Sequence, residues 1–600
     1  MRFKSKKVDG FCVYAVSGVN TISFAIDASE AARNGLLGFT VDRFDPAENH
    51  RSTMPGFKVF KSIVPDPQPN QWVSTNDHPM QSLIWDDFTA KDGRTYEYTF
   101  RPLRGTPYQL DRRAAPITIT VKTEPLYTTD DQDVFFNRGV ASSQAYERKF
   151  GNLAPNKLKP KAKEEEAINW LARDLDDAIL KFIGSAGKKD TLLCCFYEFH
   201  YKPVVEALAA ARKNVGKLRI IIDAKENGKK ARKDKNGKTV KAQDAFPRVA
   251  NRKAIKDAGI PKSCIIERDA NPSSIQHNKF MVILRGAAQA PTDVWTGSTN
   301  ISEGGVTGHT NVGHWVHDGV TAKAFKAYWD LVAKNPGSMK DDDKATATTK
   351  KAVYRKAVQA LGQVPTTRAA IKKGVTTVFS PRTGPDVLNL YVDLVDKADD
   401  VSCITLAFGV NALFKAQLED NTPQDHLTFL LLDQKDKPSK NATTPFVALN
   451  ARNNVYKAWG AFIKNAVYQW AKETNAKLLR LNSHVGYIHS KFLLRDPLGK
   501  DPIVVTGSAN FSKASTNDND ENMIIIRGNQ RVADIYFTEF NRLFNHYYFR
   551  SVTESTGDLP DDSARFLAET PKEWLEKYAP GKLKAKRLKV FTGMEGITNA

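Results

Sequence analysis

One short pattern occurs twice in this chain, and it constrains the fold more than any other feature. Each copy places a histidine two residues before a lysine in an apolar run, and a Gly-Ser-x-Asn segment follows. Residues i and i+2 of a β-strand point to the same face, so each histidine is predicted to lie beside its lysine on one sheet surface. The repetition therefore predicts two similar halves. The copies are Ile275–Phe280 with Gly297–Asn300, and Tyr487–Phe492 with Gly507–Asn510.

The residue types at these positions suit phosphate chemistry. A histidine can attack phosphorus or exchange protons at neutral pH, while a lysine supplies positive charge. Brought together, His277, Lys279, His489 and Lys491 predict a phosphate pocket with an imidazole on each side of the phosphorus. A single His-x-Lys more often marks an exposed basic strand edge. The repeated glycine and the helix start that follows it both suit anion binding, and they favour the pocket.

Both copies resemble the signature of the phospholipase D superfamily, which reads His-x-Lys-x-x-x-x-Asp followed by Gly-Ser-x-Asn. The second copy fits fully and includes Asp496, whereas the first has Leu284 where the signature has Asp. The resemblance covers roughly residues 130–550 and implies a phosphodiesterase built from two phospholipase D-like β/α domains related by a pseudo-twofold axis. In this family the Asp supports the structure and does not react, and we expect the same of Asp496.

The resemblance also implies the partner of each imidazole. In the family, the side chain eleven residues after the signature Asn hydrogen-bonds the reacting histidine, and here those side chains are Asn311 and Glu521. We expect Glu521 to keep a proton on His489, which makes His489 the general acid. We expect Asn311 to leave His277 neutral and therefore nucleophilic. The alternative is that Asn311 only caps a strand end.

The predicted mechanism needs no metal and no other cofactor. His277 attacks phosphorus and forms a phosphohistidine, while His489 protonates the leaving oxygen and then activates water. Lysine and asparagine side chains neutralise the charge on the phosphate oxygens. The predicted catalytic residues are His277, Lys279, Asn300, His489, Lys491, Asn510 and Glu521, and Ser298, Ser508 and Asn311 are predicted to bind substrate.

Composition indicates a polyanionic partner. The chain has 600 residues, too many for one core, and a net charge of +21. This charge favours nucleic acid, with anionic phospholipid as the alternative. The segment from Lys225 to Lys241 is rich in Lys and Arg and predicts a flexible basic loop or hairpin, or else a solvated charge run. Substrate contacts are predicted for its residues Lys229, Lys230, Arg232 and Lys233.

Several features bear on the cellular compartment. The 5 cysteines lie mostly in apolar runs without metal-binding spacing, which indicates reduced core residues. Basic residues precede the apolar run Phe11–Val19 and imitate a signal peptide, but alternation on both sides of Ser17–Asn20 predicts a β-hairpin instead. No stretch is apolar over the ~18 residues that a membrane span needs. We expect a cytoplasmic protein, with secretion as the alternative.

The rhythm of apolar runs divides the chain into parts. Residues 1–125 alternate over short runs and predict an all-β sandwich, immunoglobulin- or fibronectin-like, of a kind familiar from bacterial two-motif proteins. Alternating strands and helices then predict an α/β fold with two phospholipase D-like halves, residues 126–340 and 371–550, joined by a polar linker, residues 341–370. Residues 551–600 are predicted to be a basic C-terminal extension. Because both halves lie in one chain, no dimer is needed to complete the site.

Other titratable residues near the motifs have two interpretations. His484, His309, His314 and the pair Glu198 and His200 either line the pocket or are structural, and we expect them to be structural. The leading functional hypothesis is a metal-independent nuclease. One alternative is a phospholipase D or cardiolipin-synthase-like phosphatidyltransferase. Another is a non-catalytic polyanion-binding protein on a degenerate scaffold, for which Leu284 is the main support.

Overall fold

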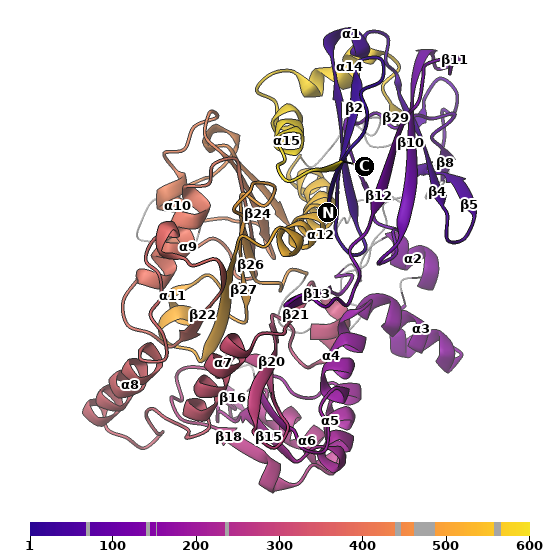
Figure 1. Ribbon diagram of the computed structural model, residues 1–600. Coiled ribbons are helices and arrows are strands. Elements are labelled where there is room, and N and C mark those ends of the chain that lie inside the picture. Colours follow the sequence, from indigo (N-terminus) through magenta and orange to yellow (C-terminus); the bar gives the residue numbers. More distant parts are fainter. Residues whose placement is uncertain are drawn as a thin grey trace.

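The computed structural model describes residues 1–67, 72–139, 144–151, 153–233, 239–438, 446–460, 487–556 and 566–599. Figure 1 shows a β-rich part that contains the N-terminus, beside two parts in which helices cover a sheet. The fold is therefore mixed α/β, as the sequence predicts. No helix within the described residues is long and apolar enough to cross a bilayer.

The N-terminal residues form two larger sheets, and some of their strands alternate buried and exposed side chains. In Ile117–Lys122 every second side chain is buried. The predicted hairpin is confirmed, since Phe11–Ser17 pairs antiparallel with Ile22–Ala28. A relation to immunoglobulin or fibronectin domains stays a prediction. One sheet runs β30 (Thr598–Asn599), β1 (Arg2–Lys4), β2 (Phe11–Ser17), β3 (Ile22–Ala28) and β9 (Ile84–Asp87); the other runs β11 (Gln109–Asp111), β10 (Thr95–Thr106), β4 (Gly38–Asp45) and β5 (His50–Thr53), with β12 (Ile117–Lys122) beside β10.

The first mixed sheet contains the first histidine motif. Across the sheet it runs β13 (Gln132–Phe136), β21 (Val312–Val316), β20 (Ala290–Gly297), β19 (Lys279–Arg285), β14 (Thr191–Phe196), β15 (Lys217–Asp223) and β18 (Ile265–Arg268). Strands β14, β15 and β18 are parallel, and the remaining pairs are antiparallel. Every residue of β14 is buried, as expected for a central strand covered on both faces.

The second mixed sheet contains the second motif and repeats the same order of pairings. It runs β22 (Gly374–Ser380), β28 (Glu521–Arg527), β27 (Ile503–Gly507), β26 (Phe492–Arg495), β23 (Val401–Leu406), β24 (Leu427–Leu432) and β25 (Val455–Trp459). Its last three strands are again parallel and its other pairs antiparallel. Each strand thus has a counterpart in the first sheet, with β26 corresponding to β19.

Two helices lie between the mixed sheets. α7 (Gly319–Val332) follows β21 and contacts β14, β19 and β20 as well as β22; α12 (Gln530–Thr556) follows β28 and contacts β13 as well as β25, β26 and β27. α12 also contacts β2 and β3, so it joins all three parts of the chain. Apart from α8 and α15, which are described below, the remaining α-helices of the described residues are α1 (Glu30–Arg33), α2 (Gln144–Phe150), α3 (Lys161–Ala172), α4 (Leu175–Gly184), α5 (Lys202–Asn214), α6 (Arg248–Asp257), α9 (Asp386–Asp396), α10 (Ala412–Leu418), α11 (Lys513–Asn517) and α14 (Pro571–Leu575).

Two segments differ from the prediction. The predicted polar linker contains a helix, α8 (Lys344–Gln359), which begins where the Asp343 carboxylate accepts hydrogen bonds from two backbone N–H groups. The predicted C-terminal extension packs back onto the N-terminal part, because α15 (Leu583–Thr592) contacts β2 and β3, and β30 joins β1 in parallel. Both segments are rich in lysine, which conceals the few apolar side chains that anchor them.

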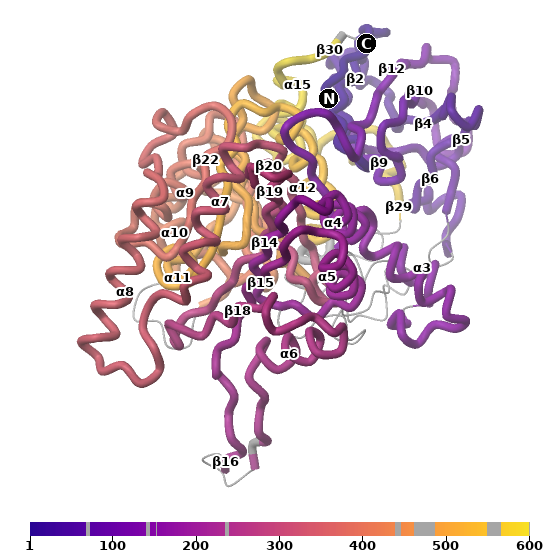
Figure 2. Tube along the Cα trace, turned by 60° about the horizontal axis from the view of Figure 1, so that its bottom comes forward, coloured from indigo at the N-terminus to yellow at the C-terminus, as the bar shows by residue number. Residues whose placement is uncertain are grey.

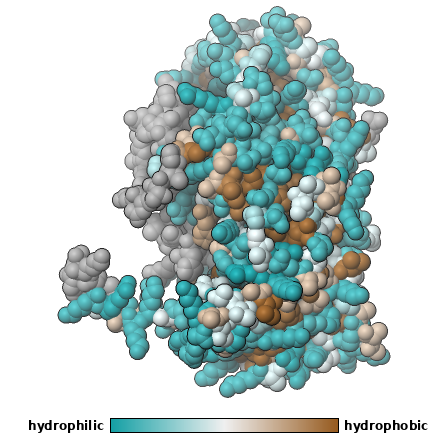
Figure 3. All heavy atoms as spheres, turned by 90° about the vertical axis from the view of Figure 1, so that its left-hand side faces the viewer, coloured by the Kyte–Doolittle hydropathy of each residue, from teal (hydrophilic) through white to brown (hydrophobic). Residues whose placement is uncertain are grey.

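The basic segment after β15 forms a two-stranded arm. β16 (Arg232–Lys233) pairs with β17 (Thr239–Val240), and nearer the body Lys229 pairs with Gln243. Figure 2 shows the arm leaving the body near β18 and α6, and Figure 3 shows its surface to be mainly hydrophilic. Of the alternatives left open by the sequence, the hairpin is confirmed over the described residues.

Candidate active site

The two histidine motifs meet where the mixed sheets face each other. His277 lies just before β19 and His489 just before β26. The backbone N–H of His277 donates to the Asp520 carbonyl oxygen at 2.9 Å, and the N–H of Thr310 donates to the Tyr487 carbonyl oxygen at 2.8 Å. Both bonds join one half to the other, so both predicted His-x-Lys pairs come together in a single site within one chain.

Each imidazole is held by a side chain from the opposite half. Nδ1 of His277 lies 3.0 Å from both carboxylate oxygens of Glu521, and Nδ1 of His489 lies 2.9 Å from Oδ1 of Asn311. The predicted pairing of Glu521 with His489 and of Asn311 with His277 is therefore wrong, because the partners are exchanged. Spacing within one motif could not reveal this, since Asn311 directly before β21 and Glu521 at the start of β28 each contact the histidine of the other half.

Two serines hold these partners in place. The Ser298 hydroxyl donates to Asn311 Oδ1 at 2.8 Å, and the Ser508 hydroxyl donates to Glu521 Oε2 at 2.7 Å. All four side chains are completely buried. These contacts orient the two imidazoles. Direct substrate binding by Ser298, Ser508 and Asn311, and a catalytic role of Glu521, stay predictions.

The exchanged pairing leaves one nitrogen of each ring for chemistry. Both Nδ1 atoms are engaged by Glu521 and Asn311, and no described residue hydrogen-bonds Nε2 of His277 or His489. An acceptor at Nδ1 selects the tautomer whose Nε2 carries a lone pair. Each ring is therefore oriented for attack or proton transfer through Nε2.

The two lysines bring positive charge into a buried site. Lys279 and Lys491 are each 1% exposed, and each Nζ donates to the carbonyl oxygen of the histidine two residues earlier. Burial lowers the pKa of Lys279 to about 7. It lowers the pKa of Lys491 well below its usual value, and the nearby Lys279 ammonium adds to the effect. A bound phosphate would favour the charged form of both amines.

Burial also lowers the pKa of both imidazoles. For His277 the Glu521 carboxylate opposes the effect of burial without overcoming it. For His489 burial acts together with the Lys491 ammonium and His309, so its pKa falls well below the usual value. The positive charges in the site repel one another until an anion arrives. Among the described residues, no three His, Cys, Asp or Glu side chains are grouped to hold a metal ion.

The two signature asparagines differ in what they offer. Asn300 Nδ2 donates to Glu198 Oε1 at 2.8 Å, and within the described part of the chain neither the buried Oδ1 of Asn300 nor that of Asn510 has a hydrogen-bond partner. Burial raises the pKa of Glu198, but the nearby His200 and Ser302 side chains and the Lys279 ammonium outweigh burial and hold that pKa below its usual value. Glu198 therefore takes one of the two amide N–H donors of Asn300, and the predicted contact of Asn300 with phosphate stays a prediction.

Two rings flank the imidazoles. The Tyr197 ring lies 5.0 Å from the His277 ring between centroids. His309 stacks on His489 at 4.5 Å with an interplanar angle of 24°, and its Nδ1 accepts a hydrogen bond from Asn311 Nδ2 at 2.8 Å. His309 therefore belongs to the site, contrary to the expectation that it is only structural. Tyr197 was missed because nothing in the sequence near it carries a motif.

Comparison with known proteins agrees with this geometry. The family model described as "Cardiolipin synthase, PLD-like domain" matches residues 179–331 and 426–544, and each matched range contains one histidine motif. The chain belongs to the phospholipase D superfamily. No curated protein matches the chain.

Solved structures resemble this phospholipase D superfamily chain at low identity. Polyphosphate kinase from Porphyromonas gingivalis is 12% identical with a TM-score of 0.32; the match covers 60% of this chain and 46% of the kinase, so the chain spans less than half of the kinase's length. Phosphatidylserine synthase from Haemophilus influenzae is 11% identical with a TM-score of 0.41, and the match covers 70% of this chain and 93% of the synthase. Nuc, a phospholipase D family member from Salmonella typhimurium, is 22% identical with a TM-score of 0.20, and the match covers 27% of this chain and 87% of Nuc.

The departure from the phospholipase D signature lies away from the site. Asp496 follows the last residue of β26, and its carboxylate accepts backbone N–H groups of residues 399–401 at 2.8 to 3.1 Å. Leu284 lies near the end of β19 and is 4% exposed, while the Asp190 carboxylate accepts two backbone N–H groups at the corresponding turn. Because Asp496 holds a turn and Leu284 fills the core, the missing carboxylate does not remove a reacting group.

An aspartate at the end of the same strand in each sheet was also missed. Asp223 Oδ2 accepts the N–H of Gln276 at 2.9 Å, and Asp433 Oδ1 accepts the N–H groups of Tyr487 and Ile488 at 2.7 and 2.9 Å. Each carboxylate thus holds the backbone just before a motif histidine. The signal was present, because in both halves an aspartate follows three aliphatic residues and precedes x-Lys.

The arm lies outside the His-Lys cluster but its base reaches the edge of the site. Asn227 Nδ2 donates to the Phe246 carbonyl oxygen, and the Phe246 N–H donates to Asn227 Oδ1, which closes the base of the arm. The Phe246 ring lies 6.3 Å from the ring of Tyr197. The predicted substrate contacts Lys229, Lys230, Arg232 and Lys233 are exposed on the arm, whereas Lys225 is buried at its root.

The remaining predicted residues separate into structural and undescribed ones. His314 is structural, as expected: its Nε2 lies 2.9 Å from Gln132 Oε1, and burial lowers its pKa to about 3. His200 lies beside Glu198, with 3.6 Å between Nε2 and a carboxylate oxygen. His484 lies outside the described residues.

Proposed function

We propose that this protein cleaves nucleic-acid phosphodiester bonds without a metal ion, through a covalent phosphohistidine on His277. The observation that carries the proposal is the reciprocal pairing of His277 with Glu521 and His489 with Asn311. It leaves two Nε2 atoms, one from each half, in a buried site that also holds Lys279 and Lys491. The repeated strand order and this reciprocity also support a pseudo-twofold relation between the halves.

In the first chemical step, Nε2 of His277 attacks phosphorus. A P–N bond forms and the bond from phosphorus to the leaving oxygen breaks. The leaving oxygen takes the proton from Nε2 of His489. Lys279 and Lys491 carry the positive charge that stabilises the non-bridging oxygens, and the dry surroundings strengthen that attraction.

In the second step, neutral His489 takes a proton from water. The resulting hydroxide oxygen bonds to phosphorus, and the P–N bond breaks. The electron pair returns to Nε2 of His277, and His489 regains its proton for the next cycle. His489 therefore gives up a proton in the first step and takes one from water in the second, as expected of an acid that becomes a base in the reverse-like step.

The observed pairing gives a new physical reason for these roles. Attack places positive charge on the His277 ring, and the Glu521 carboxylate 3.0 Å from Nδ1 stabilises that charge. The amide of Asn311 offers His489 no such stabilisation, so protonated His489 is a stronger acid. The negative charge of the bound substrate supplies the proton affinity that His489 lacks in the empty site.

Charge supports nucleic acid as the substrate. The chain carries a net charge of +21, and four exposed cations follow the arm from its paired base to β16. Phosphates neutralised by such cations release counterions, which makes binding strong at low salt and weak at high salt. The base of the arm ends at Phe246, whose ring contacts the ring of Tyr197, and the Tyr197 ring in turn lies beside the ring of His277. A strand held by the arm would thus be led toward the attacking ring.

A phosphatidyltransferase is the second candidate. The matching family model carries the description of a cardiolipin synthase domain. After β23, in the position that Glu198 occupies after β14, lies Phe408, whose side chain is 71% exposed. An exposed aromatic side chain at that place would suit an acyl chain better than a phosphate backbone.

One experiment separates the two candidates. The purified protein is incubated with plasmid, with RNA and with vesicles containing anionic phospholipid, each with and without excess EDTA. We expect nucleic-acid cleavage that persists in EDTA and no change in the lipid. Phosphatidyl transfer without nucleic-acid cleavage would replace the proposal by the second candidate, and activity restored only by added divalent metal would contradict the mechanism.

Arm variants test the substrate independently. Replacing Lys229, Lys230, Arg232 and Lys233 by Gln should weaken nucleic-acid binding and flatten its dependence on salt, with no change in turnover of a small chromogenic phosphodiester. A matched control replaces four exposed cations elsewhere, Arg113, Lys202, Lys397 and Lys500, which are 91%, 81%, 63% and 80% exposed. Equal effects of both sets would show that the arm contributes only net charge.

A further inference from the structure

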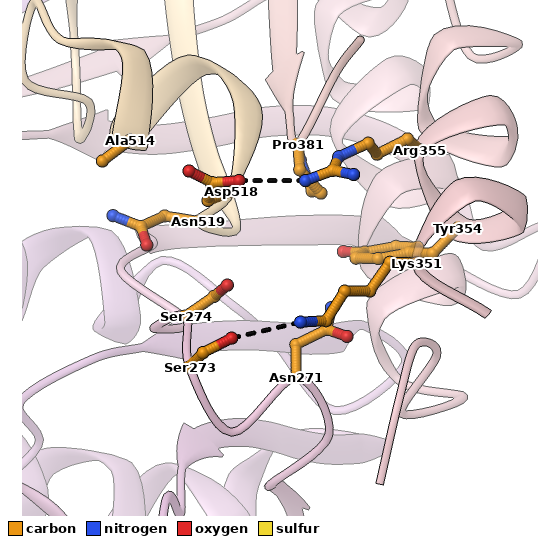
Figure 4. Close-up of a pocket in the computed structure, with 10 residues that line it drawn as sticks. All are labelled: Asn271, Ser273, Ser274, Lys351, Tyr354, Arg355, Pro381, Ala514, Asp518 and Asn519. Carbon is orange, nitrogen blue, oxygen red and sulfur yellow. Dashed lines mark hydrogen bonds and ion pairs between the residues drawn. The ribbon is translucent and has the colours of Figure 1, made fainter. Parts of the chain in front are cut away.

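A pocket of about 320 Å³ is lined by residues from both halves of the chain, which Figure 4 shows, and none of the His-Lys residues lines it. Helix α8 forms one wall with Lys351, Tyr354 and Arg355. The loop that leads to His277 forms the opposite wall with Ser273 and Ser274, and the turn after α11 contributes Asn519. Its volume is near the lower limit of roughly 300 Å³ for small-molecule sites.

The side chains of this pocket suit an anion. Lys351 and Arg355 are one helical turn apart and project from the same face of α8. Asp518 is the one carboxylate that lines the pocket, and it is paired with Arg355 at 2.9 Å. Lys351 Nζ has only the Ser273 hydroxyl, at 3.1 Å, and the Ser274 hydroxyl has no protein partner among the described residues. One unneutralised ammonium group and two hydroxyls thus face the same space.

The pocket is built onto the supports of the reacting histidine. The Tyr354 hydroxyl donates to Asp520 Oδ1 at 2.9 Å, and the Asp520 carbonyl oxygen accepts the N–H of His277. Asn519 Oδ1 accepts the N–H of Ile275 at 3.2 Å. A ligand in the pocket would therefore lie against the same backbone that positions His277, although it would touch neither Lys279 nor Lys491.

We propose that this pocket is a second binding site, which takes a phosphate group of a nucleotide between Lys351 and Ser274. The preference for phosphate follows from the pocket's own side chains, and the choice of a nucleotide rests on the function proposed above. Two sources could supply the same chemistry: the neighbouring nucleotide of the strand being cleaved, or a free nucleotide.

Binding stoichiometry tests the site without any turnover. A nucleoside 5′-monophosphate is titrated calorimetrically into the wild-type protein and into Lys351→Gln, with inorganic phosphate as a second probe. We expect two sites in the wild type, one in the His-Lys cluster and one in the pocket. Lys351→Gln should weaken one of them about tenfold or more, as expected for loss of a charged hydrogen bond. The control is Lys356→Gln, an exposed cation of α8 that does not line the pocket.

A single site in the wild type, or two sites unaffected by Lys351→Gln, would overturn the proposal. Equal melting temperatures of the two variants show that neither has lost its fold. Because this experiment measures binding and not cleavage, its outcome can be interpreted even if the protein proves not to be a nuclease.

Kinetics then distinguishes the sources. If the neighbouring nucleotide occupies the pocket, Lys351→Gln raises KM about tenfold for an oligonucleotide and leaves the small chromogenic phosphodiester unchanged. If a free nucleotide occupies it, KM for the oligonucleotide stays unchanged while the monophosphate loses its second site. Both outcomes support a phosphate site in the pocket.

Discussion

The two mixed sheets share one strand order but place different side chains around their imidazoles. Residues that hold the backbone recur in both halves, as Asp223 and Asp433 do at the ends of β15 and β24. Residues that set the charge on each ring do not recur, since Glu521 faces His277 and Asn311 faces His489. The comparison shows that the two sheets share their strand order, while the side chains beside the two imidazoles differ.

Further side chains differ between the two halves. The His277 side has Glu198 near Lys279 and an Asp520 carboxylate that is bonded by the buried guanidinium of Arg268 at 2.8 Å. At the position of Asp520 the His489 side has Thr310, whose hydroxyl lies 3.0 Å from the Ser490 hydroxyl. Carboxylates thus gather around the ring that gains positive charge in the proposed mechanism. The ring that must give up a proton is surrounded by neutral side chains and by Lys491.

The largest expected effect comes from removing either ring. His277→Ala and His489→Ala should each reduce nucleic-acid cleavage by about 10³-fold or more, because nucleophile and acid act in one step. The variants should differ with an activated leaving group, which needs no proton. His489→Ala should then release a burst of leaving group, whereas His277→Ala should not. Near-native turnover by either variant would rule out a site shared by both halves.

Exchanging the partners should have the next largest effect. Glu521→Gln removes the carboxylate that stabilises charge on His277 and should lower kcat about 10²-fold. Asn311→Asp places a carboxylate beside His489 and raises the pKa of that imidazole. The acid form then persists to higher pH, so the alkaline limb of the pH–kcat profile should move upward. An unmoved limb in Asn311→Asp would show that His489 is not the acid.

Burial of the Lys279 amine should make the unfolding free energy of the protein depend on pH. Its pKa is about 7 in the folded protein against 10.5 in the unfolded chain, so between these values the unfolded chain binds more protons. The unfolding free energy of the wild type should therefore rise with pH from about 7 to about 10. Lys279→Met lacks this penalty and should melt several degrees higher at pH 7, with the difference closing toward pH 10.

A phosphate titration provides the control for this prediction. Saturating phosphate should stabilise the wild type and take up protons on binding near pH 8, because the anion favours the charged amine. In Lys279→Met, phosphate should stabilise the fold less and fewer protons should be taken up on binding. A variant no more stable than the wild type at pH 7 would mean that the ammonium of Lys279 is already neutralised within the protein.

The smallest effect on catalysis is expected at Asp496, where the halves differ without consequence for the site. Asp496→Asn keeps the shape but weakens the bonds to the backbone of residues 399–401, and should lower the unfolding free energy by about 1–3 kcal/mol. Its kcat should stay within about twofold of the wild type. Denaturant unfolding and steady-state kinetics measure the two quantities, and a large loss of kcat at unchanged stability would assign Asp496 to the chemistry.

Local patterns predicted what depends on local structure. The hairpin around Ser17–Asn20 and the hairpin that follows Lys225 lie at the expected residues, because alternating side chains and turn residues determine such elements. The His-x-Lys pairs were found because the two residues of each pair are close in sequence, although the histidines lie just before β19 and β26 and not on a strand as predicted. The exchanged partners of the imidazoles could not be found this way, since their contacts join residues of opposite halves. The same holds for α8, whose Tyr354 is anchored by Asp520 far along the chain.

The most direct test of the division between the halves is to locate the phosphoryl group on the protein. The His489→Ala variant is mixed with a phosphodiester that has an activated leaving group, quenched at alkaline pH, digested and examined by mass spectrometry. Since the variant can form the P–N bond but lacks the base that activates water, the intermediate should accumulate. We predict a phosphorylated imidazole at His277, and none when Glu521→Gln is added at the same reaction time. A phosphoryl group found instead on His489 in the His277→Ala variant, with His277 unmodified in His489→Ala, would contradict the account.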